Sequence, residues 1–406
     1  MSEWKEVSLS ELGKTITGKT PSSQYPEDFG DEVPFITPSD SFEKKYISRS
    51  ERYLSRLGSD RLKDKIISSD SIMVTCIGSA MGKVAKNSLP SVTNQQINSI
   101  IVNENFDSDY IYYLFKNNYA VFRNAASGST AIPILNKTDF DNLRFKVELN
   151  LNEQRKMVSI LSTIDDKIEI NNQINQELEA MAKTLYDYWF VQFDFPDQNG
   201  KPYKSSGGKM VYNQELKREI PEGWGVENLF NVAEVQYGYP FSTDYFNSTG
   251  EGVPVIRIRD ILGNDTTNYS TEEVEDKYKI NVGDVLIGMD GNFHMNYWIK
   301  DYCYLNQRVV KVNSDKLPNM VLKYQIEPFI KLREKSVSRT TVGHLSDKDL
   351  KAINVILPKD KYLSSIFEKF ESILENIIIN QQQNQELTQL RDWLLPMLMN
   401  GQVKVE

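Results

Sequence analysis

Two repeated α+β units joined by two long antiparallel coiled-coil helices are the architecture that this sequence predicts. Three observations lead to it. The second half of the 406-residue chain repeats the pattern of the first half, each half begins with short apolar runs between turn residues, and each half ends in a long stretch with helical periodicity. The sequence thus reads as one design of about 210 residues written twice.

The repeat is visible as aligned motifs at a slowly drifting offset. Asn94-Gln95-Gln96-Ile97 aligns with Asn306-Gln307-Arg308-Val309 at an offset of 212, and Asn175-Gln176-Glu177-Leu178 aligns with Asn384-Gln385-Glu386-Leu387 at 209. Loops of different length would produce this drift. We therefore expect the two halves to share one topology.

Residues 1–150 are predicted to form the first globular domain, and residues 223–358 the second. Short apolar runs such as Ile72-Met73-Val74 are separated there by Gly, Pro, Ser and Asn, which is typical of short strands and turns with a few helices. Residues 196–222 contain Asn199-Gly200 and Gly207-Gly208 and are predicted to be a linker.

Residues 151–195 and 359–406 are predicted to contain the two long helices. Apolar residues recur at steps of three and four from Met157 to Tyr188 and from Phe370 to Leu394, and neither stretch contains Gly. Packed as an antiparallel coiled coil, the helices would bring their midpoints, Asn171 and Asn380, face to face as a buried layer that fixes register. In the alternative interpretation, these residues and the run 380–385 form a solvated face.

Composition excludes several classes of protein. Two cysteines, Cys76 and Cys303, are too few for a disulfide framework or a structural zinc site. The start lacks the apolar core of a signal peptide, and no stretch approaches the roughly 20 apolar residues of a membrane span, so a cytoplasmic location is expected. The net charge of −9 disfavours a uniformly basic nucleic-acid binder.

A catalytic interpretation has weak support in the sequence. Gly13 to Thr20 fits the phosphate-binding pattern G-x-x-x-x-G-K-T, but a poor strand precedes it, Pro21 and Pro26 prevent a following helix, and the second repeat has Gly238-Tyr239-Pro240 there. A methyltransferase motif and a nuclease cluster are also missing from the sequence; the acidic run 272–276 is predicted to be solvated surface. No catalytic residue and no metal ligand is predicted.

Several motifs, in order and partly in duplicate, carry a resemblance. They are Gly18-Lys19-Thr20-Pro21-Ser22, Asn94-Gln95-Gln96, Leu135-x-x-x-Asp139-Phe140-x-x-Leu143, Asn152-Glu153-Gln154-Arg155, Leu185-Tyr186-x-x-Trp189-Phe190-Val191-x-Phe193 and Leu394-Leu395-Pro396-x-Leu398-x-x-Gly401. Over essentially its whole length the chain resembles the specificity subunit of type I restriction-modification enzymes.

The resemblance implies a non-catalytic subunit with two target recognition domains, residues 1–150 and 223–358. Each would read one half of a bipartite, asymmetric sequence in double-stranded DNA, with the helices setting the spacing. It also implies two methyltransferase subunits and two restriction subunits as partners, which would carry S-adenosylmethionine, ATP and Mg, so that this chain binds no cofactor itself. The alternative is a bivalent scaffold of the same shape that binds proteins and not DNA.

Candidate DNA contacts follow from charge and residue type. Residues 43–87 carry a net charge of +5 and are a candidate phosphate track, whereas residues 151–222 and 359–406 together carry −5. Arg suits guanine and Gln suits adenine. The predicted DNA-binding residues are Lys19, Thr20, Ser22, Ser39, Lys44, Lys45, Ser79, Lys83, Asn94, Gln95, Gln96 and Ser129 in the first repeat, and Tyr239, Arg257, Arg259, Asn292, His294, Gln307, Arg308, Arg339 and Thr340 in the second. His344 is predicted to replace an apolar residue at a packed turn.

Overall fold

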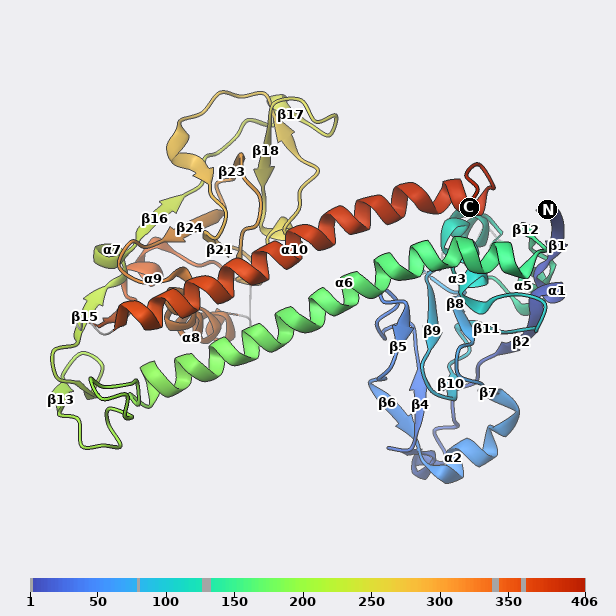
Figure 1. The fold of residues 1–406 in the computed structure, drawn as a ribbon, viewed down its shortest axis with the longest axis horizontal. Coiled ribbons are helices and arrows are strands. Elements are labelled where there is room, and N and C mark those ends of the chain that lie inside the picture. The colour runs from blue at the N-terminus through green and yellow to red at the C-terminus, as the bar shows by residue number, and fades with distance from the viewer. Residues whose placement is uncertain (1–2, 79–80, 126–132, 338–342, 359–362, 406) are drawn as a thin grey trace. The chain divides into compact units, whose positions relative to one another are not determined.

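The α+β prediction is confirmed in a computed structural model, which contains two β-rich domains and two long helices that pack together (Figure 1). The structure describes residues 3–78, 81–125, 133–337, 343–358 and 363–405. It divides into two compact units. Unit 1 comprises Met1–Ile168 and Glu386–Glu406, and unit 2 comprises Glu169–Gln385.

Domain 1, the β-rich part of unit 1, has three sheets among its described residues. Their strand orders are β1-β12, β2-β11-β8-β9-β5 and β3-β6-β4-β10-β7. The strands are β1 Trp4–Ser8, β2 Gly13–Thr17, β3 Phe29–Gly30, β4 Val33–Ile36, β5 Tyr46–Ile47, β6 Arg52–Leu54, β7 Ile66–Ile67, β8 Ile72–Thr75, β9 Val84–Asn87, β10 Ser91–Thr93, β11 Ile97–Val102 and β12 Arg144–Glu148. Since β1 pairs with β12, the first and last strands close the domain.

The helices of domain 1 are short. They are α1 Leu9–Leu12, α2 Arg56–Arg61, α3 Ser108–Asn117, α4 Tyr119–Asn124 and α5 Lys137–Asn142. Helices α1, α3 and α5 contact the β2-β11-β8-β9-β5 sheet, whereas α2 contacts β6 of the other five-stranded sheet. Helix α3 begins at Asp107, whose carboxylate caps the backbone N–H groups of Asp109 and Tyr110. Its side chains from Tyr110 to Phe115 are all buried, which makes α3 the centre of the core of domain 1.

Domain 2, the β-rich part of unit 2, repeats this topology except that a four-stranded sheet stands in place of the five-stranded β2-β11-β8-β9-β5 sheet. Its sheets have the orders β15-β25, β16-β24-β21-β22 and β17-β19-β18-β23-β20. The strands are β15 Gly225–Asn228, β16 Glu234–Tyr237, β17 Phe246–Asn247, β18 Val253–Ile256, β19 Tyr269–Ser270, β20 Lys279–Ile280, β21 Val285–Gly288, β22 Met295–Tyr297, β23 Cys303–Leu305, β24 Val309–Asn313 and β25 Asn354–Leu357; the helices are α7 Leu229–Val232, α8 Asn319–Val337 and α9 Asp347–Lys351.

One parallel strand pair recurs in both domains and matters for the site. Strand β4 pairs in parallel with β10, and β18 pairs in parallel with β23. The remaining neighbours of β10 and β23 are the antiparallel strands β7 and β20. Because parallel strands end at the same edge of a sheet, the residues after β4 and β10 emerge together, as do those after β18 and β23.

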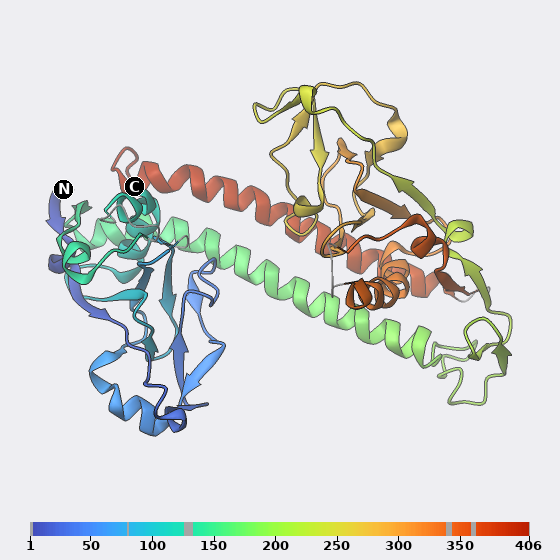
Figure 2. The ribbon, with the colours of Figure 1, turned by 180° about the vertical axis from the view of Figure 1, so that it is seen from behind.

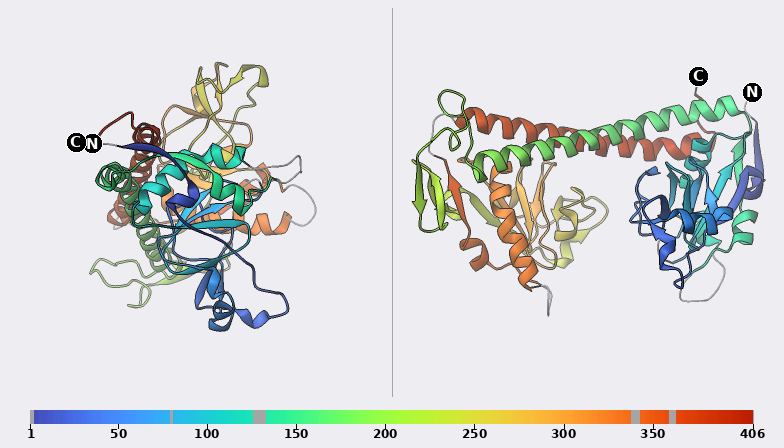
Figure 3. Two further views of the ribbon diagram at one scale, coloured as in Figure 1. Left: turned by 90° about the vertical axis from the view of Figure 1, so that its right-hand side faces the viewer. Right: turned by 90° about the horizontal axis from the view of Figure 1, so that it is seen from below.

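The two long helices are α6, Leu151–Tyr186, which continues into a π-helical turn at Asp187–Val191, and α10, Ser364–Met399. They run side by side in every view (Figures 1, 2 and 3). Hydrogen bonds join residues 171, 172 and 175 of α6 to residues 384, 383, 380 and 377 of α10, in descending order along α10. The predicted antiparallel direction is therefore confirmed.

The predicted pairing of Asn171 with Asn380 is wrong by one helical turn. Asn171 is fully buried and donates to Asn384 Oδ1 at 2.9 Å, while Asn380 donates to Asn175 Oδ1 at 2.8 Å. Asn171 corresponds to Asn380 and Asn175 to Asn384 in the repeat. Two equivalent asparagine layers, Asn171–Asn384 and Asn175–Asn380, thus flank the pseudo-symmetric centre of the helix pair. Neither Asn171 nor Asn380 lies on that centre.

Residues 196–222, which the sequence predicts as a linker, are folded. They contain the hairpin β13–β14, Met210–Asn213 and Arg218–Pro221. Phe195 stacks on Tyr203 and on Trp224, with ring centroids 4.7 and 4.8 Å apart. Aromatic packing that joins both ends of the segment holds it against domain 2.

The end of α10 belongs to the core of domain 1. Leu395, Leu398 and Met399 are buried against Val7, Leu12 and their neighbours, whereas the preceding part of the helix, from Ile366 to Ile378, is buried in domain 2.

Within the described residues, no helix is long and apolar enough to cross a membrane.

Candidate nucleic-acid interface

In domain 1, loops that follow strands β2, β4, β8 and β10 converge, and we call them the strand-end loops. Lys19 N–H donates to Thr93 O at 2.8 Å and Thr20 Oγ1 donates to Gln95 Oε1 at 2.5 Å. Asn94 N–H donates to Ile36 O at 3.0 Å. The structure therefore gathers Lys19, Thr20, Asn94, Gln95 and Gln96, which lie far apart in sequence.

The strand-end loops of domain 2 are built in the same way. Tyr239 N–H donates to Leu305 O at 2.9 Å, and Asn306 N–H donates to Ile256 O at 3.1 Å. This brings the segment after β16 against the segments after β18 and β23. Arg257 and Arg259 follow β18, and Gln307 and Arg308 follow β23, so these predicted contacts share one group of loops.

A further backbone bridge repeats at each set of strand-end loops. In domain 1, Gly78 N–H donates to Pro133 O at 3.1 Å and Leu135 N–H donates to Cys76 O at 2.9 Å. In domain 2, Gly291 N–H donates to Gly343 O at 2.9 Å and Leu345 N–H donates to Met289 O at 2.7 Å. The same backbone frame is therefore present twice, and the side chains on it differ.

At that bridge an apolar pair in domain 1 becomes a hydrogen-bonded polar pair in domain 2. Ile77 faces Ile134, whereas Asp290 faces His344. Asp290 Oδ1 lies 2.6 Å from His344 Nδ1, and Asp290 Oδ2 lies 3.3 Å from Arg308 Nε. His344 does replace an apolar residue, but its ring is half-exposed and bonded to Asp290, so the predicted packed turn is corrected to a polar one.

Sequence reasoning missed Asp290, which holds the guanidinium of Arg308 from one side. The alignment contained a signal, since an acid and a histidine replace two isoleucines at equivalent positions. It also contained a signal for a shared cap: Asp40 accepts a hydrogen bond from Thr37 N–H at 2.7 Å, and Asp260 accepts one from Arg257 N–H at 2.9 Å. Both carboxylates fix the loop after the parallel strand.

Arg257 and Arg259 concentrate positive charge at the domain 2 loops. Burial and, after it, the neighbouring charge of Arg259 lower the pKa of Arg257. Arg259 Nε lies 3.8 Å from Asp260 Oδ1. The Arg259 side chain is 69% exposed, so its guanidinium is accessible from solvent. Two adjacent guanidinium groups of this kind suit a phosphate or a guanine edge.

Residues 43–87, the candidate phosphate track, have fewer unpaired basic side chains than their net sequence charge suggests. Lys45 Nζ binds Asp109 at 2.9 Å, and the fully buried Lys86 binds Asp109 and Asp70, each at 2.5 Å. Arg61 binds Asp28 at 2.6 Å. Lys45 thus has a structural partner inside unit 1, while Lys44 and Lys83 are exposed.

Most other predicted contacts lie on accessible loops. Ser22, Ser39, Gln95, Asn292 and Gln307 are exposed, and Gln96 and His294 are half-buried. Asn94 is buried and acts as a turn residue, because its Oδ1 accepts from Gln96 N–H at 3.0 Å. Four predicted contacts, Ser79, Ser129, Arg339 and Thr340, lie outside the described residues.

Tyr239 is held by packing and by a carboxylate. Its ring centroid lies 5.1 Å from that of Phe241 and 5.3 Å from that of Tyr278, and its Oη donates to Glu272 Oε1 at 2.9 Å. Ser242 N–H donates to Glu272 Oε2 at 2.8 Å. The acidic run is therefore solvated surface in part, since Glu272 is half-buried and structural.

The structure contradicts the nucleotide-binding interpretation of Gly13 to Thr20. Residues Gly13–Thr17 form strand β2, which pairs along its length with β11, where a phosphate-binding loop would need free backbone N–H groups. A Cβ on Gly13 would lie 2.2 Å from Ile101 O, so this glycine serves strand packing. Within the described part of the chain there is also no group of three or more His, Cys, Asp or Glu that could hold a metal ion.

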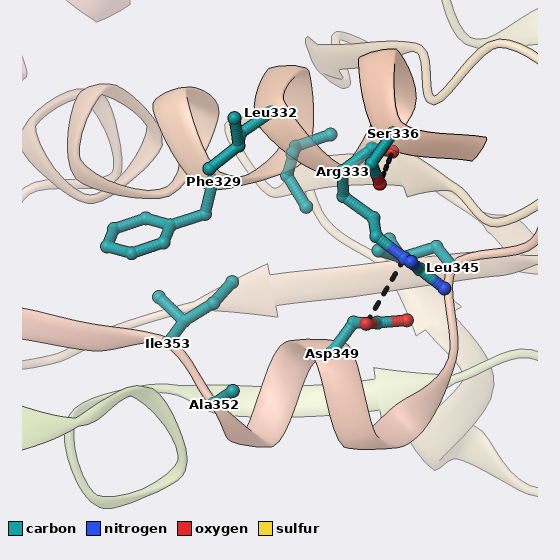
Figure 4. A pocket seen from close by; sticks show the side chains of 9 residues that line it. Phe329, Leu332, Arg333, Ser336, Leu345, Asp349, Ala352 and Ile353 are labelled. Carbon is teal, nitrogen blue, oxygen red and sulfur yellow. Dashed lines mark hydrogen bonds and ion pairs between the residues drawn. The ribbon is translucent and has the colours of Figure 1, made fainter. Parts of the chain in front are cut away.

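A pocket of about 300 Å³ lies elsewhere on domain 2, between α8 and α9 (Figure 4). Phe329, Leu332, Leu345 and Ile353 supply an apolar lining, and Arg333 Nε lies 3.2 Å from Asp349 Oδ1 at one side. The lining offers few polar groups, and those present bind each other. This pocket therefore does not add base-reading groups to the strand-end loops.

Two β-rich domains that present equivalent loops with different polar side chains define a class of duplicated, two-domain proteins. The family model for the type I restriction modification DNA specificity domain matches residues 1–180 and 221–389. The chain belongs to this family of type I restriction-modification specificity subunits, which supply DNA specificity and are not catalytic; catalysis and its cofactors belong to the methyltransferase and restriction subunits.

Full-length relatives agree with this assignment. The MjaIX specificity subunit of Methanocaldococcus jannaschii is 28% identical over all of this chain and 94% of that relative. The HindI specificity subunit of Haemophilus influenzae is 22% identical over 99% of this chain and 100% of its own length. The crystal structure of the type I S subunit from M. genitalium has the same fold, with a TM-score of 0.56 and 18% identity over 98% of this chain and 96% of that one. A protein-binding scaffold without a DNA role is thereby excluded.

Proposed function

We propose that residues 1–150 and 223–358 are two target recognition domains that each read one half of a bipartite, asymmetric DNA sequence. The observation that carries this proposal is the pair of strand-end loops, which share a backbone frame and differ in side chains. Equivalent frames would dock on DNA in equivalent ways, and different side chains would select different bases. Gln96 in domain 1 stands where Arg308 stands in domain 2.

The proposed contacts divide into base readers and phosphate binders. Gln95, Gln96, Gln307 and Arg308 are the proposed base readers, since amides suit adenine and guanidinium suits guanine. Proposed phosphate contacts and supporting polar contacts are Lys19, Thr20, Ser22, Ser39, Lys44, Lys83, Arg257, Arg259, Asn292 and His294, with Ser79, Ser129, Arg339 and Thr340 as further candidates from the sequence alone.

We further propose that α6 and α10 set the distance between the half-sites and dock two methyltransferase subunits, with two restriction subunits completing the complex. The asparagine layers support a fixed register. The pairing of Lys45, Lys86 and Arg61 with carboxylates reduces the free positive charge of residues 43–87 below their net sequence charge. DNA binding by this chain alone is therefore expected to be weak and salt-sensitive, with partners completing the basic surface.

Methylome sequencing of cells that express the chain with its methyltransferase partner tests the proposal. We expect one methylated motif with two defined half-sites separated by a fixed number of unspecified bases. Exchange of residues 1–150 for those of a family member with another target should change one half-site and leave the other unchanged. A continuous motif, or a change in both half-sites, would contradict the proposal.

A further inference from the structure

The run Asn380-Gln381-Gln382-Gln383-Asn384-Gln385 places six consecutive amide side chains on α10, and each takes part in a hydrogen bond. Three of them face α6. Asn380 donates to Asn175, Gln383 accepts from Asn171 at 2.8 Å, and Asn384 bonds Asn171 and Asn172. The run is therefore not the solvated face of the alternative interpretation.

The other three amides face domain 2. Gln382 Nε2 donates to Ile299 O at 2.7 Å, and Gln385 Nε2 donates to Asn264 O at 2.9 Å. Asn264 Nδ2 in turn donates to Gln381 Oε1 at 3.4 Å. Asn264 is buried and has a φ of +51°, so its carbonyl is presented from a constrained turn.

We propose that residues 380–385 form an amide clamp that locks domain 2 onto the helix pair and so determines how sharply the protein discriminates spacer length. This inference rests on the proposed bipartite recognition. Gln382 and Gln385 act as positioning residues in it, because their side chains donate to main-chain carbonyls of domain 2.

The physical reason why the clamp can position domain 2 is that hydrogen bonds are directional and apolar contacts are not. Ile373, Leu374, Ile377 and Ile378 of α10 already bury an apolar face in domain 2, but apolar contact has no preferred direction and permits sliding and rotation. Hydrogen bonds to the main-chain carbonyls of Ile299 and Asn264 fix both. Since the same six-residue segment also bonds α6 through Asn380, Gln383 and Asn384, helix register and domain placement are set by one segment.

The first repeat lacks an equivalent attachment at the corresponding residues. Gln382 and Gln385 correspond to Gln173 and Gln176 on α6. Gln173 donates to Glu169 of its own helix at 3.2 Å, and Gln176 is exposed. In domain 1, Tyr113 donates to Asp165 of α6 at 2.6 Å and Lys45 donates to Ser162 at 3.0 Å, beside the buried apolar residues Met157 and Leu161. Gln173 and Gln176 therefore provide a matched control for Gln382 and Gln385.

The test compares the double variant Gln382→Ala/Gln385→Ala with the control Gln173→Ala/Gln176→Ala, each as the full chain in complex with its methyltransferase partner. Methylation rates are measured on duplexes that carry both half-sites at the natural spacer and at spacers one base pair longer and shorter. We expect the preference for the natural spacer to fall about tenfold in the clamp variant, from loss of two hydrogen bonds, and to stay within about twofold in the control. The bases of the half-sites should not change.

An unchanged spacer preference in the clamp variant, or an equal loss in the control, would overturn the clamp. If the double variant is inactive, the single variant Gln382→Glu, which retains side-chain size but removes the donor, is examined by hydrogen exchange at residues 262–266 and 298–300. Exchange several-fold faster than in the wild type supports the clamp, and identical exchange refutes it. A wild-type motif that is not bipartite refutes the proposed function instead, and the exchange result still decides whether the clamp exists.

Discussion

At the scale of single residues, domain 1 and domain 2 carry different side chains on equivalent backbone bridges. Gln96 and Arg308 occupy one position, and Ile77–Ile134 and Asp290–His344 occupy one bridge. A shared frame with exchanged side chains changes which base edges find a partner without changing how the loops are folded. Specificity in this chain is thus expected to reside in few side chains.

Arg308 provides the first prediction at this scale. Arg308→Ala should reduce discrimination at one base pair of one half-site about tenfold, because a guanidinium–guanine pair is worth roughly 1–3 kcal/mol. Arg308→Gln, which introduces the residue of the equivalent position in domain 1, should shift the preference at that base pair towards adenine. Methylation of duplexes with each of the four base pairs measures this.

The control for Arg308 is Lys348→Ala, which removes an exposed charge on α9 and should leave the base preference unchanged. A loss of preference in both half-sites after Arg308→Ala would be incompatible with a local base reader.

Asp109 provides the second prediction. Burial alone would raise the pKa of Asp109, but hydrogen bonds from Lys86 and Lys45 outweigh it, so the pKa is lowered. A carboxyl whose folded pKa is lowered contributes stability that is complete above its unfolded pKa of about 3.9 and is lost as the pH falls through the folded value. Asp109→Asn should therefore destabilise unit 1 by about 3 kcal/mol at neutral pH and remove part of its acid sensitivity.

Urea unfolding of unit 1 between acid and neutral pH checks this prediction. Asp64→Asn is the matched control within unit 1, because Asp64 Oδ2 lies 3.8 Å from Lys65 Nζ but the Asp64 side chain is 72% exposed. Its effect should stay below about 1 kcal/mol. Equal effects of the two variants would show that the buried cluster does not stabilise domain 1.

At the scale of elements, the helix pair is specified by two asparagine layers rather than by a single central one. Asn171–Asn384 and Asn175–Asn380 are related by the repeat, and each costs stability relative to apolar packing because buried amides must be fully paired. A slip by one turn would bring Asn171 opposite Asn380 and would break both existing pairs. The layers therefore select one register among several that the apolar stripe permits.

A double-mutant cycle on one layer tests this selection. Asn171→Leu should destabilise unit 2 by about 1–3 kcal/mol, because Gln383 and Asn384 lose a donor. Asn171→Leu/Asn384→Leu should cost less than the sum of the single variants, with a coupling of about 1 kcal/mol. The cycle Asn175/Asn380 should give the same result, and additive single effects in both cycles would contradict a paired layer.

At the scale of the whole molecule, the boundaries of the two compact units differ from the boundaries of the two sequence repeats. Residues 386–406 form the end of the second repeat in sequence but pack in unit 1, where Leu398 is fully buried. Completion of domain 1 therefore requires the last residues of the chain. The first and last segments of the protein are expected to fold together.

Leu398→Ala should destabilise unit 1 by roughly 2–5 kcal/mol through the lost burial and the cavity, and leave unit 2 unaffected. Leu390→Ala is the control on the same helix, because Leu390 is 44% exposed. Two transitions in a thermal scan, one of which moves, would support the prediction. A shift of the unit 2 transition alone would contradict it.

Spacer length is a property of the whole molecule. One heptad added to both α6 and α10 at matched positions lengthens the pair by about 10 Å, which corresponds to about three base pairs. The methylated motif should gain about three unspecified bases and retain its half-sites. A heptad added to α6 alone should mismatch the asparagine layers and destabilise the protein; altered half-sites at a constant spacer would refute a spacing role.

Local sequence determined the two repeats, the extent of the long helices and most of the strand-end residues. Periodicity and turn chemistry act over a few residues, so the short apolar run at Ile72–Val74 and the helical stretch after Leu151 could be placed in advance. Family motifs in duplicate identified the class of protein for the same reason, because they do not depend on how distant segments meet.

Tertiary packing alone decided which distant groups became partners. From the sequence, Lys45 and Lys86 count as free positive charges. In the structure both form ion pairs with Asp109, because α3 packs beside β9. The Asn171 layer was predicted one turn away from its true partner, since periodicity fixes a face and not a register. The glycine-rich segment 196–222 became folded through Phe195 and Trp224. In each case the deciding energy comes from contacts between residues far apart in sequence, where burial of charge, amide pairing and aromatic packing outweigh local preference.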